Sequence, residues 1–400
     1  MHTTRGSSSG SSSLASPTLL AMSATATSEP LRTTPFLELH KQHHAKLVPF
    51  AGWEMPLLYT SIIEEHHQVR NSGGFFDVSH MGRLKFTGRH ARRFLDRVCS
   101  RQIFGMENGQ CRYSLVLNEQ GGCRDDVIVY RFDDDEYLMV CNASNRAKLL
   151  EHFAAVRGED VFKLEDQTES TAMVAIQGPK VMDIIAKLSR EVPTLRKYRF
   201  VEKNLLVLKM IVSRTGYTGE DGVEIILGAR MARPAMSMLL KDVGAADAVV
   251  KPIGLGARDS LRLEAGMPLY GHELSEEIDP LSAGLDFAVK LDKGADDERV
   301  GTFIGQAALK RISQEGPKQR LVGVALEGRR SARQGMAVLS PEGTPVGVVT
   351  SGCLSPTLDK PIAMAYVDPS RVAPGTRLGV DLKGTTVAAE VVKMPFIQKK

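Results

Sequence analysis

Two adjacent aspartates stand at the start of a segment that is expected to be buried. Asp125 and Asp126 follow a Gly-Gly turn and open an apolar, β-branched run that ends at Tyr130. This composition is typical of a strand. Side chains alternate across a strand, so Asp126 shares a face with Tyr130, and Asp125 lies on the other face. Burying a carboxylate is costly unless it is partnered or functional. One interpretation is a cap on the turn, and the other is a group that does chemistry.

A second lone carboxylate lies in the stretch TGYTGEDGVEIIL, residues 215–227. Residues 219–222 are typical of a turn and residues 223–227 of a strand, with Glu224 as its single charge. If the face that carries Glu224 is buried, the carboxylate needs a hydrogen-bond donor. A carboxylate can accept two parallel N–H bonds from an amino-heterocycle, as it does from arginine. Tyr217 is close enough in sequence to line the same pocket.

Arg258 is placed unusually for a cation. Residues 258–265 are predicted as a short helix, in which Asp259 suits the first turn. A cation at a helix N-terminus is disfavoured, so Arg258 is easier to explain if it faces an anion. The alternative is an internal salt bridge with Asp259 or Glu264. Together with Asp126 and Glu224, Arg258 favours a pocket for a flat, nitrogen-rich ligand with a carboxylate tail, the shape of folate.

Several other kinds of site are not indicated. The sequence has no GxxxxGK[ST], GxSxG or HExxH motif. Residues 254–259 begin like GxGxxG but end in aspartate, far from any N-terminal βαβ unit, so NAD binding is not predicted. Ser79 and His80 lie near Asp77, but a turn with local hydrogen bonds is favoured over a nucleophile. The pairs at residues 43–44 and 66–67 are interpreted as surface or packing histidines, and no metal site is predicted.

Composition narrows the class of protein. A chain of 400 residues is expected to form two or three domains. The net charge of +4 gives no nucleic-acid signature, and no apolar stretch is long enough to span a membrane. Five scattered cysteines without a CxxC pair indicate a reducing compartment.

The first 31 residues differ from the rest. They are rich in Ser, Thr and Ala, and we expect a disordered tail. They could serve as a mitochondrial transit peptide, but Arg5 is their only base, and such peptides usually carry several. Met22 is a possible start. The preferred interpretation is a plain tail on a cytoplasmic protein, and the alternative is the mitochondrial matrix.

Short strands joined by tight turns predict an antiparallel α+β architecture. Helices are expected over residues 62–69, 88–98 and 146–157. Strands are expected over residues 83–86, 113–117, 127–130, 137–140, 172–177, 205–213 and 223–227. Beyond residue 317, Val-rich runs alternate with Pro-Glu-Gly, Pro-Gly and Lys-Gly turns, which predicts a small all-β barrel or sandwich. The expected domains are residues 33–316, with two α+β subdomains, and residues 318–397.

From about Thr33 to Phe396 the chain resembles the aminomethyltransferases, or T proteins, of the glycine cleavage system. The resemblance rests on several motifs in order: TPFLELHKQHHAKLVPFAGWEMPLLY, FFDVSHMG, YSLVLNEQGGCRDDVIVY, GYTGEDGVEI, GLGARDSLRLEAGMPLYGHEL, VTSGCLSPTL and KMPF. It implies two α+β folate-binding units and a C-terminal β-barrel around a central hole.

The resemblance also implies an activity. Such an enzyme takes the one-carbon unit of S-aminomethyldihydrolipoyl H protein and transfers it to tetrahydrofolate as co-substrate, without metal, flavin or NAD. The products are 5,10-methylenetetrahydrofolate, ammonia and dihydrolipoyl H protein. Lipoylated H protein is the implied partner, with the P and L proteins in the same system, and neither nucleic acid nor membrane is implied.

Individual site residues carry over from the family. The second aspartate of its Asp-Asp pair is the key catalytic group, which implies Asp126, with Asp125 capping the turn or solvated. Glu224 matches the pterin-binding glutamate, and Arg258 matches an arginine that contacts the folate's anionic side. Pocket-lining positions match Met81, Tyr113, Ile128, Tyr130, Asn142 and Tyr217. The chain departs from the family at Phe287, where tryptophan is frequent, and in ending without a C-terminal tyrosine that contacts folate in some members.

Two other classes of protein are rival interpretations of the sequence. One is a folate-binding relative without transferase activity, such as those that assist iron–sulfur assembly. These lack the full motif set, and the presence of Asp126, Glu224 and Arg258 argues against it. The other is the folate domain of a sarcosine- or dimethylglycine-oxidising enzyme, which carries a flavin-binding domain with an N-terminal GxGxxG. The chain has no such segment.

Overall fold

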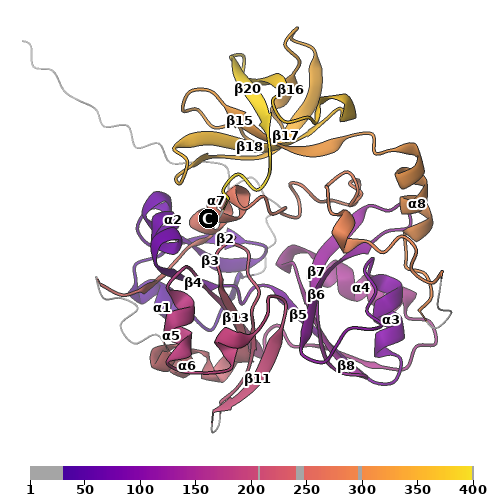
Figure 1. The fold of residues 1–400 in the computed structure, drawn as a ribbon. Helices are drawn as coiled ribbons and strands as arrows, with labels where there is room; N and C mark the ends of the chain where they lie inside the picture. The colour runs from indigo at the N-terminus through magenta and orange to yellow at the C-terminus, as the bar shows by residue number, and fades with distance from the viewer. Residues whose placement is uncertain (1–29, 206–207, 240–246, 296–299, 399–400) are drawn as a thin grey trace, which may run out of the picture.

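The computed structural model describes residues 30–205, 208–239, 247–295 and 300–398. Two sheets with helices lie side by side, and a barrel formed by the C-terminal part of the chain sits above them (Figure 1). The predicted α+β class with a C-terminal all-β barrel is confirmed. The tail expected over residues 1–31 lies, apart from its last two residues, outside the described part of the chain.

The first sheet is antiparallel, in the order β6-β7-β8-β5-β9. Two helices pack on one of its faces, because that face carries an apolar set that includes Val127 and Val129 and needs a cover. The strands are β5 (Gly82–Thr87), β6 (Gln110–Leu117), β7 (Cys123–Asp133), β8 (Glu136–Cys141) and β9 (Lys163–Asp166), and the helices are α3 (Ala91–Val98) and α4 (Arg146–Val156).

The second sheet has the order β11-β12-β13-β10-β4-β14 and is antiparallel except where β14 pairs with β4. Of the strand expected over residues 205–213, residues 208–213 form β12, and residue 205 is the last of β11, which pairs with β12. The strands are β4 (Gly73–Asp77), β10 (Thr171–Gln177), β11 (Phe200–Leu205), β12 (Leu208–Ser213), β13 (Gly222–Gly228) and β14 (Val250–Pro252). The helices around this sheet are α1 (Leu37–Gln42), α2 (Ile62–Asn71), α5 (Val181–Ala186), α6 (Ala232–Leu239) and α7 (Leu255–Glu264).

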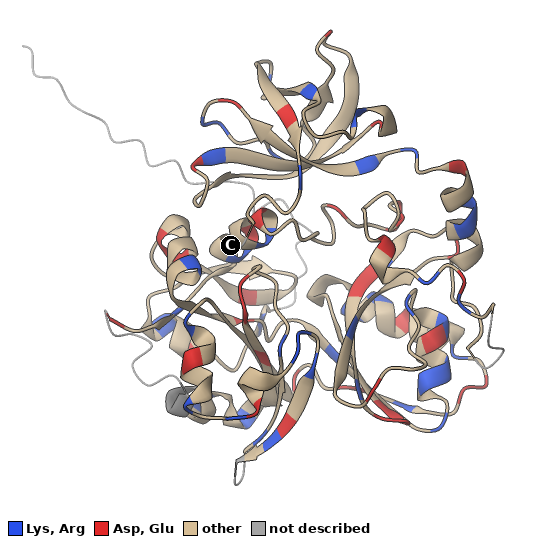
Figure 2. Ribbon diagram, viewed as in Figure 1, with Lys and Arg blue, Asp and Glu red and all other residues tan. Residues whose placement is uncertain are grey.

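A small N-terminal sheet and the barrel complete the fold. The small sheet joins β1 (Arg32–Thr33), β3 (Trp53–Leu58) and β2 (Lys46–Phe50). Helix α8 (Gln306–Glu315) leads into the barrel, which closes in the order β15-β18-β17-β16-β19-β20 around an aliphatic core. The barrel strands are β15 (Arg320–Leu326), β16 (Ala337–Leu339), β17 (Pro345–Ser355), β18 (Lys360–Val367), β19 (Arg377–Asp381) and β20 (Thr386–Val392). Basic and acidic residues are interspersed over all these parts (Figure 2).

Helix α7 connects the second sheet to the barrel through a buried carboxylate. Glu264 accepts hydrogen bonds from Ser355 and Thr357 of the barrel and forms ion pairs with Arg70 (2.9 Å) and His66 (3.1 Å) of α2. His66 is therefore a packing histidine, as the sequence suggested. Burial opposes ionisation, but the bonds from His66 and Ser355 and the charge of Arg70 lower the pKa of Glu264 to about 2.

Replacing Glu264 with glutamine is expected to lower the free energy of unfolding by about 3 kcal/mol at pH 7, because the largely buried Arg70 guanidinium loses its ion-pair partner. A folded-state pKa of about 2, against 4.5 for the ordinary group, means that the stabilisation is present above pH 4.5 and is lost as the pH falls towards 2. Denaturant titrations of both proteins across this range measure the difference. Glu327→Gln, at an exposed position, is the matched control. An equal loss in both variants would contradict the assignment.

Candidate functional site

The two adjacent aspartates divide their roles by strand face. Asp125 is fully buried on the face covered by α4, where it accepts hydrogen bonds from the backbone N–H of Asn142 (3.0 Å) and from the side-chain amides of Asn142 and Asn145 (both 2.7 Å). Asp126 is half-buried on the other face and accepts from the Asn142 amide (2.7 Å) and the Tyr113 hydroxyl (3.2 Å). Asp125 therefore caps the turn into α4, and the alternative that it is solvated is wrong.

The pair is also electrostatically coupled. Burial, and then the neighbouring charge of Asp126, raise the pKa of Asp125. Burial also raises the pKa of Asp126, but the hydrogen bonds from Asn142 and Tyr113 oppose that rise. Two carboxylates this close do not both ionise easily. Asp126 is partly open to solvent, whereas Asp125 is not, and this exposure favours the ionised form of Asp126.

Glu224 lies at the centre of β13, between Ser213 of β12 and Ala175 of β10. Its side chain is buried and accepts a hydrogen bond from the Thr215 hydroxyl, the donor that burial requires. Burial raises the pKa of Glu224, and the Thr215 bond and the charge of Arg258 counter that effect. One carboxylate oxygen has this hydroxyl partner, and the other can still accept N–H bonds from a ligand.

A chain of hydroxyl groups connects Glu224 to the strand of Asp126. The Thr215 hydroxyl is 2.7 Å from that of Ser213, which is 3.1 Å from the hydroxyl of Tyr130. Tyr130 is fully buried, so it joins the two sheets from within rather than presenting an open wall. Sequence reasoning missed Ser213, Thr215 and Asn145. Thr215 was detectable, because it opens the same stretch that contains Glu224.

The Arg258 guanidinium lies 4.8 Å from the ring centre of Tyr217 and 6.0 Å from that of Phe76, as expected for cation–π contacts. Its Nη1 atom is buried and has no hydrogen-bond partner among the residues that the structure describes. Burial lowers the pKa of Arg258, and the charge of Glu224 opposes that change. An unsatisfied buried N–H on a cation is a group that an anionic ligand would satisfy.

The helix around Arg258 begins earlier than the sequence suggested. It starts at Leu255, so Arg258 already donates its backbone N–H to Gly254 (3.2 Å), and Asp259 lies beyond the first turn. The expected salt bridge within the helix is absent from the described contacts of Arg258. Asp259 instead pairs with Arg262 (2.8 Å), and Glu264 is held by α2 and the barrel.

Tyr217 is influenced by several charged side chains, and Arg258 lies over its ring. Its hydroxyl donates to the carbonyl of Pro268, which fixes the ring. Burial raises the pKa of Tyr217, on which the charges of Arg262, Asp126 and Arg258 also act. Arg258 lies over the Tyr217 ring, and the charge of Asp126 acts on the same tyrosine. Arg258 also acts on Glu224, so side chains from three separate stretches of the chain influence one another.

The remaining predicted residues lie around this group. Tyr113 stacks on Phe287, with ring centres 5.9 Å apart, and the side chain of Phe287 is 62% exposed. Met81 and Ile128 are partly buried against the apolar cluster that contains Tyr130. Phe287 therefore presents an exposed aromatic ring next to Tyr113, whose hydroxyl bonds to Asp126.

The Asp77–His80 turn is structural. Asp77 accepts from the backbone N–H of Ser79 (2.9 Å) and pairs with His40 (2.9 Å), while the Ser79 hydroxyl donates to the carbonyl of Met173 (3.1 Å). This confirms local hydrogen bonding rather than a nucleophile. Among the described residues, no group of three or more His, Cys, Asp or Glu side chains is arranged to hold a metal.

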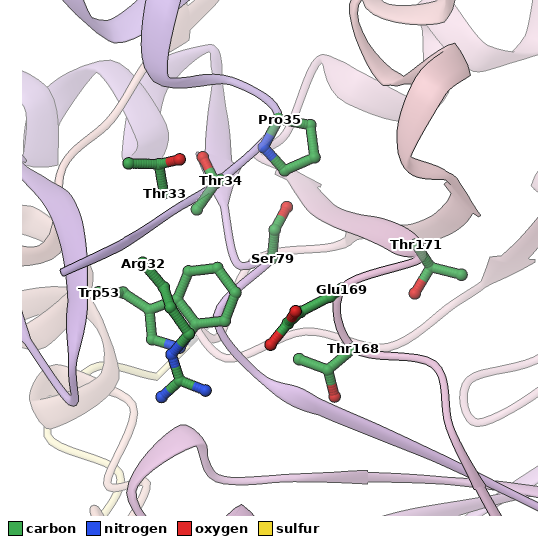
Figure 3. Close-up of a pocket in the computed structure, with 9 residues that line it drawn as sticks. All are labelled: Arg32, Thr33, Thr34, Pro35, Trp53, Ser79, Thr168, Glu169 and Thr171. Carbon is green, nitrogen blue, oxygen red and sulfur yellow. The ribbon is translucent and has the colours of Figure 1, made fainter. Parts of the chain in front are cut away.

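A polar cavity of about 420 Å³ opens beside the N-terminal sheet (Figure 3). Its lining residues are Arg32, Thr33, Thr34, Pro35, Trp53, Ser79, Thr168, Glu169 and Thr171. Four of its hydroxyls already donate to oxygens of the protein: Thr34 to Asp77, Ser79 to Met173, Thr168 to Asp166 and Thr171 to Gln167. The hydroxyl groups of this cavity are therefore largely bonded within the protein, which makes the cavity a weaker candidate for a functional site than the Asp126–Glu224–Arg258 group.

Comparisons with known proteins identify the family of the chain. The family model described as the GCVT N-terminal domain matches residues 36–293, and that of the glycine cleavage T-protein C-terminal barrel domain matches residues 319–398. Aminomethyltransferases of Saccharopolyspora erythraea and Rubrobacter xylanophilus are 42% and 44% identical, over 92% of this chain and 98% and 95% of their own length.

A solved structure is also similar. The glycine cleavage system aminomethyltransferase T of Bartonella henselae superposes with a TM-score of 0.83 at 33% identity, covering 92% of this chain and 98% of the other. No described helix is long and apolar enough to cross a membrane. The similarity runs through both sheets and the barrel, and the chain belongs to the aminomethyltransferase, or T-protein, family of the glycine cleavage system.

Proposed function

We propose that the chain transfers the one-carbon unit of S-aminomethyldihydrolipoyl H protein to tetrahydrofolate. The methylene carbon becomes bonded to N5 and N10, and the two displaced N–H protons leave with the thiol and with ammonia. The products are 5,10-methylenetetrahydrofolate, ammonia and dihydrolipoyl H protein. The H protein is the direct partner, and the P and L proteins act in the same system.

The observation that supports this proposal most strongly is the buried, unpartnered Nη1 of Arg258 next to Tyr217. Tetrahydrofolate offers an anionic side to Arg258 and adjacent N–H groups of its pterin to Glu224. A carboxylate paired with two such N–H groups makes a strong, directional contact. The stacked rings of Tyr113 and Phe287 offer an aromatic surface next to Asp126.

Asp126 is placed for electrostatic work in this reaction. The carbon passes through an iminium-like state that carries positive charge, and a fixed carboxylate in a largely buried site stabilises that charge without reorganisation. The Asn142 amide and Tyr113 hydroxyl hold both oxygens of Asp126 in place. In this proposal the fixed Asp126 carboxylate also positions N5 of tetrahydrofolate against the carbon. The same carboxylate is available for proton transfer.

The reaction itself is the test. Purified protein is incubated with aminomethyl-loaded H protein and tetrahydrofolate, and methylenetetrahydrofolate and ammonia are both assayed. Equal release of the two products supports the proposal. Binding of tetrahydrofolate without product would favour a folate-binding relative that lacks transferase activity, and a flavin absorbance would favour the oxidising class.

Glu224→Gln is expected to weaken tetrahydrofolate binding about tenfold while kcat falls less. The amide keeps the size of the side chain and its acceptor for Thr215, but it loses the charge that strengthens hydrogen bonds from the pterin. Calorimetric titration measures the dissociation constant. Glu220→Gln, in the preceding turn, is the control that removes a carboxylate outside the site. An affinity equal to wild type would exclude Glu224 from folate recognition.

A further inference from the structure

A cavity of about 370 Å³ lies between helix α5 and the sheet that carries Glu224. Aliphatic side chains form its walls, from the sheet and from the segment that follows β10. These residues are Ile176, Val181, Ile184, Ile185, Leu188, Val192, Met210, Val212, Val223, Ile225 and Val250. Glu224 stands between Val223 and Ile225 in β13, so the cavity and the candidate folate site lie on opposite faces of this strand.

The mouth of the cavity combines exposed apolar surface with charge. Leu188 is 53% exposed, and Ile184 and Ile185 are half-buried. Arg190 and Lys203 also line the cavity, together with Ser189 and Glu191. Glu191 pairs with Lys203, whereas Arg190 is exposed and has no ion-pair partner among the described residues. The polar side chains therefore present two cations and one acid beside an aliphatic interior.

The interior of this cavity is poorly hydrated, because water away from the polar side chains at the mouth would find no polar partner on the aliphatic walls. Wall atoms that face the void also lose dispersion contacts. An apolar chain restores those contacts and displaces the poorly bonded water. At about 30 Å³ for each water-sized group, the cavity has room for roughly twelve such groups.

We propose that this cavity binds a medium-chain aliphatic carboxylate, with the hydrocarbon chain between α5 and the sheet and the carboxylate at Arg190 and Lys203. A chain such as that of octanoate, with about ten non-hydrogen atoms, matches the volume. The pocket is of the usual kind for small ligands, apolar with a few polar groups at one end. This site is separate from the folate site and does not depend on the proposed reaction.

Calorimetric titration of the full chain with hexanoate, octanoate, palmitate and octanol tests the assignment. The affinity is expected to rise about tenfold from hexanoate to octanoate, because two more methylenes become buried. Palmitate exceeds the cavity and should bind no better than octanoate. Octanol lacks the charge and should bind about threefold more weakly, the modest effect of a pair at an exposed mouth. Saturating tetrahydrofolate should leave the octanoate affinity unchanged.

Filling the cavity provides the matched variants. Ile184→Phe is expected to abolish octanoate binding while the melting temperature is retained, and Val192→Phe fills the same space from the following segment should the first variant fold poorly. Ile63→Phe makes the same change at a 55% exposed position on α2 and should bind octanoate like wild type. Arg190→Gln should bring octanoate to the affinity of octanol.

Four results would overturn the assignment. The first is no heat of binding with a carboxylate of any chain length, and the second is equal octanoate affinity in wild type and Ile184→Phe. The third is displacement of octanoate by tetrahydrofolate. The fourth is a dimer of the wild-type chain that Ile184→Phe dissociates. The third would place the carboxylate in the folate site, and the fourth would make the apolar mouth an interface between copies of the chain.

Discussion

Replacing Asp126 with asparagine is expected to lower kcat for methylenetetrahydrofolate formation by about 10³-fold, within the range seen when a preorganised charge or a general base is removed. The amide is isosteric, its oxygen can still accept from Asn142, and its NH2 group can donate to the Tyr113 hydroxyl oxygen, so the fold is retained. Tetrahydrofolate affinity should change by less than kcat, because the lost interaction is strongest when positive charge develops on the carbon. Single-turnover assays with loaded H protein, alongside calorimetry, separate the two effects.

Asp125→Asn is the matched control, because it makes the same change one residue away. Asp125 accepts from three N–H groups, and an asparagine amide would direct its own N–H towards one of them. We therefore expect a lower melting temperature from Asp125→Asn and a stable but inactive protein from Asp126→Asn. Wild-type turnover in Asp126→Asn would remove this carboxylate from the mechanism.

The pH profile gives a second readout of Asp126. Burial raises its pKa above 3.8, and the ionised form is the one proposed to act. The rate should therefore fall as the pH drops through that raised pKa and should rise to a plateau above it. In Asp126→Asn this acidic limb should disappear. A limb that persists in the variant would have to come from another group.

Arg258→Met is expected to weaken tetrahydrofolate binding about 100-fold, or about 2.7 kcal/mol. The loss of a buried cation from a ligand contact has costs of this size. Methionine keeps much of the apolar stem and its packing on Tyr217 and Phe76. Because the wild-type chain already buries an N–H without a partner, we expect the variant to be as stable as wild type or more stable. Calorimetry and thermal melting measure the two quantities.

Arg258→Lys is the control for charge alone. Lysine keeps the cation but lacks the planar fork, so it should recover only part of the affinity. An unchanged folate affinity in Arg258→Met would mean that this guanidinium does not contact the ligand. Loss of affinity together with loss of stability would indicate a structural role, because a ligand contact alone would leave the unliganded protein intact.

The link between the two sheets explains why these residues act together. The Thr215, Ser213 and Tyr130 hydroxyls run from Glu224 to the strand of Asp126. Arg258 in turn lies over the ring of Tyr217. Buried, fully bonded networks of this kind hold their members in one geometry. The site is therefore positioned by the contact between the sheets, rather than by either sheet alone.

The class of elements could be predicted from the sequence alone, and the same reasoning named Asp126, Glu224 and Arg258 as candidate site residues. Alternation in residues 125–130 correctly placed Asp125 and Asp126 on opposite faces of a strand, because side-chain direction in a strand follows from local geometry. Turn dipeptides and Val-rich runs predicted the barrel for a similar reason, since hairpin signals are local. The motifs that the chain shares with the aminomethyltransferase family predicted the activity and the remaining candidate site residues.

The hydrogen-bond partners of the buried polar atoms followed from the tertiary structure. The role of Asp125 depends on Asn142 and Asn145 from another strand end. Arg258 has no ion pair among the described residues, because Glu264 is bonded to α2 and the barrel. Helix α7 begins at Leu255, three residues before the predicted start, because Gly254 adopts the extended conformation of an N-cap residue. These are contacts between segments distant in sequence. Composition and periodicity carry no record of them, because the partners are chosen by packing.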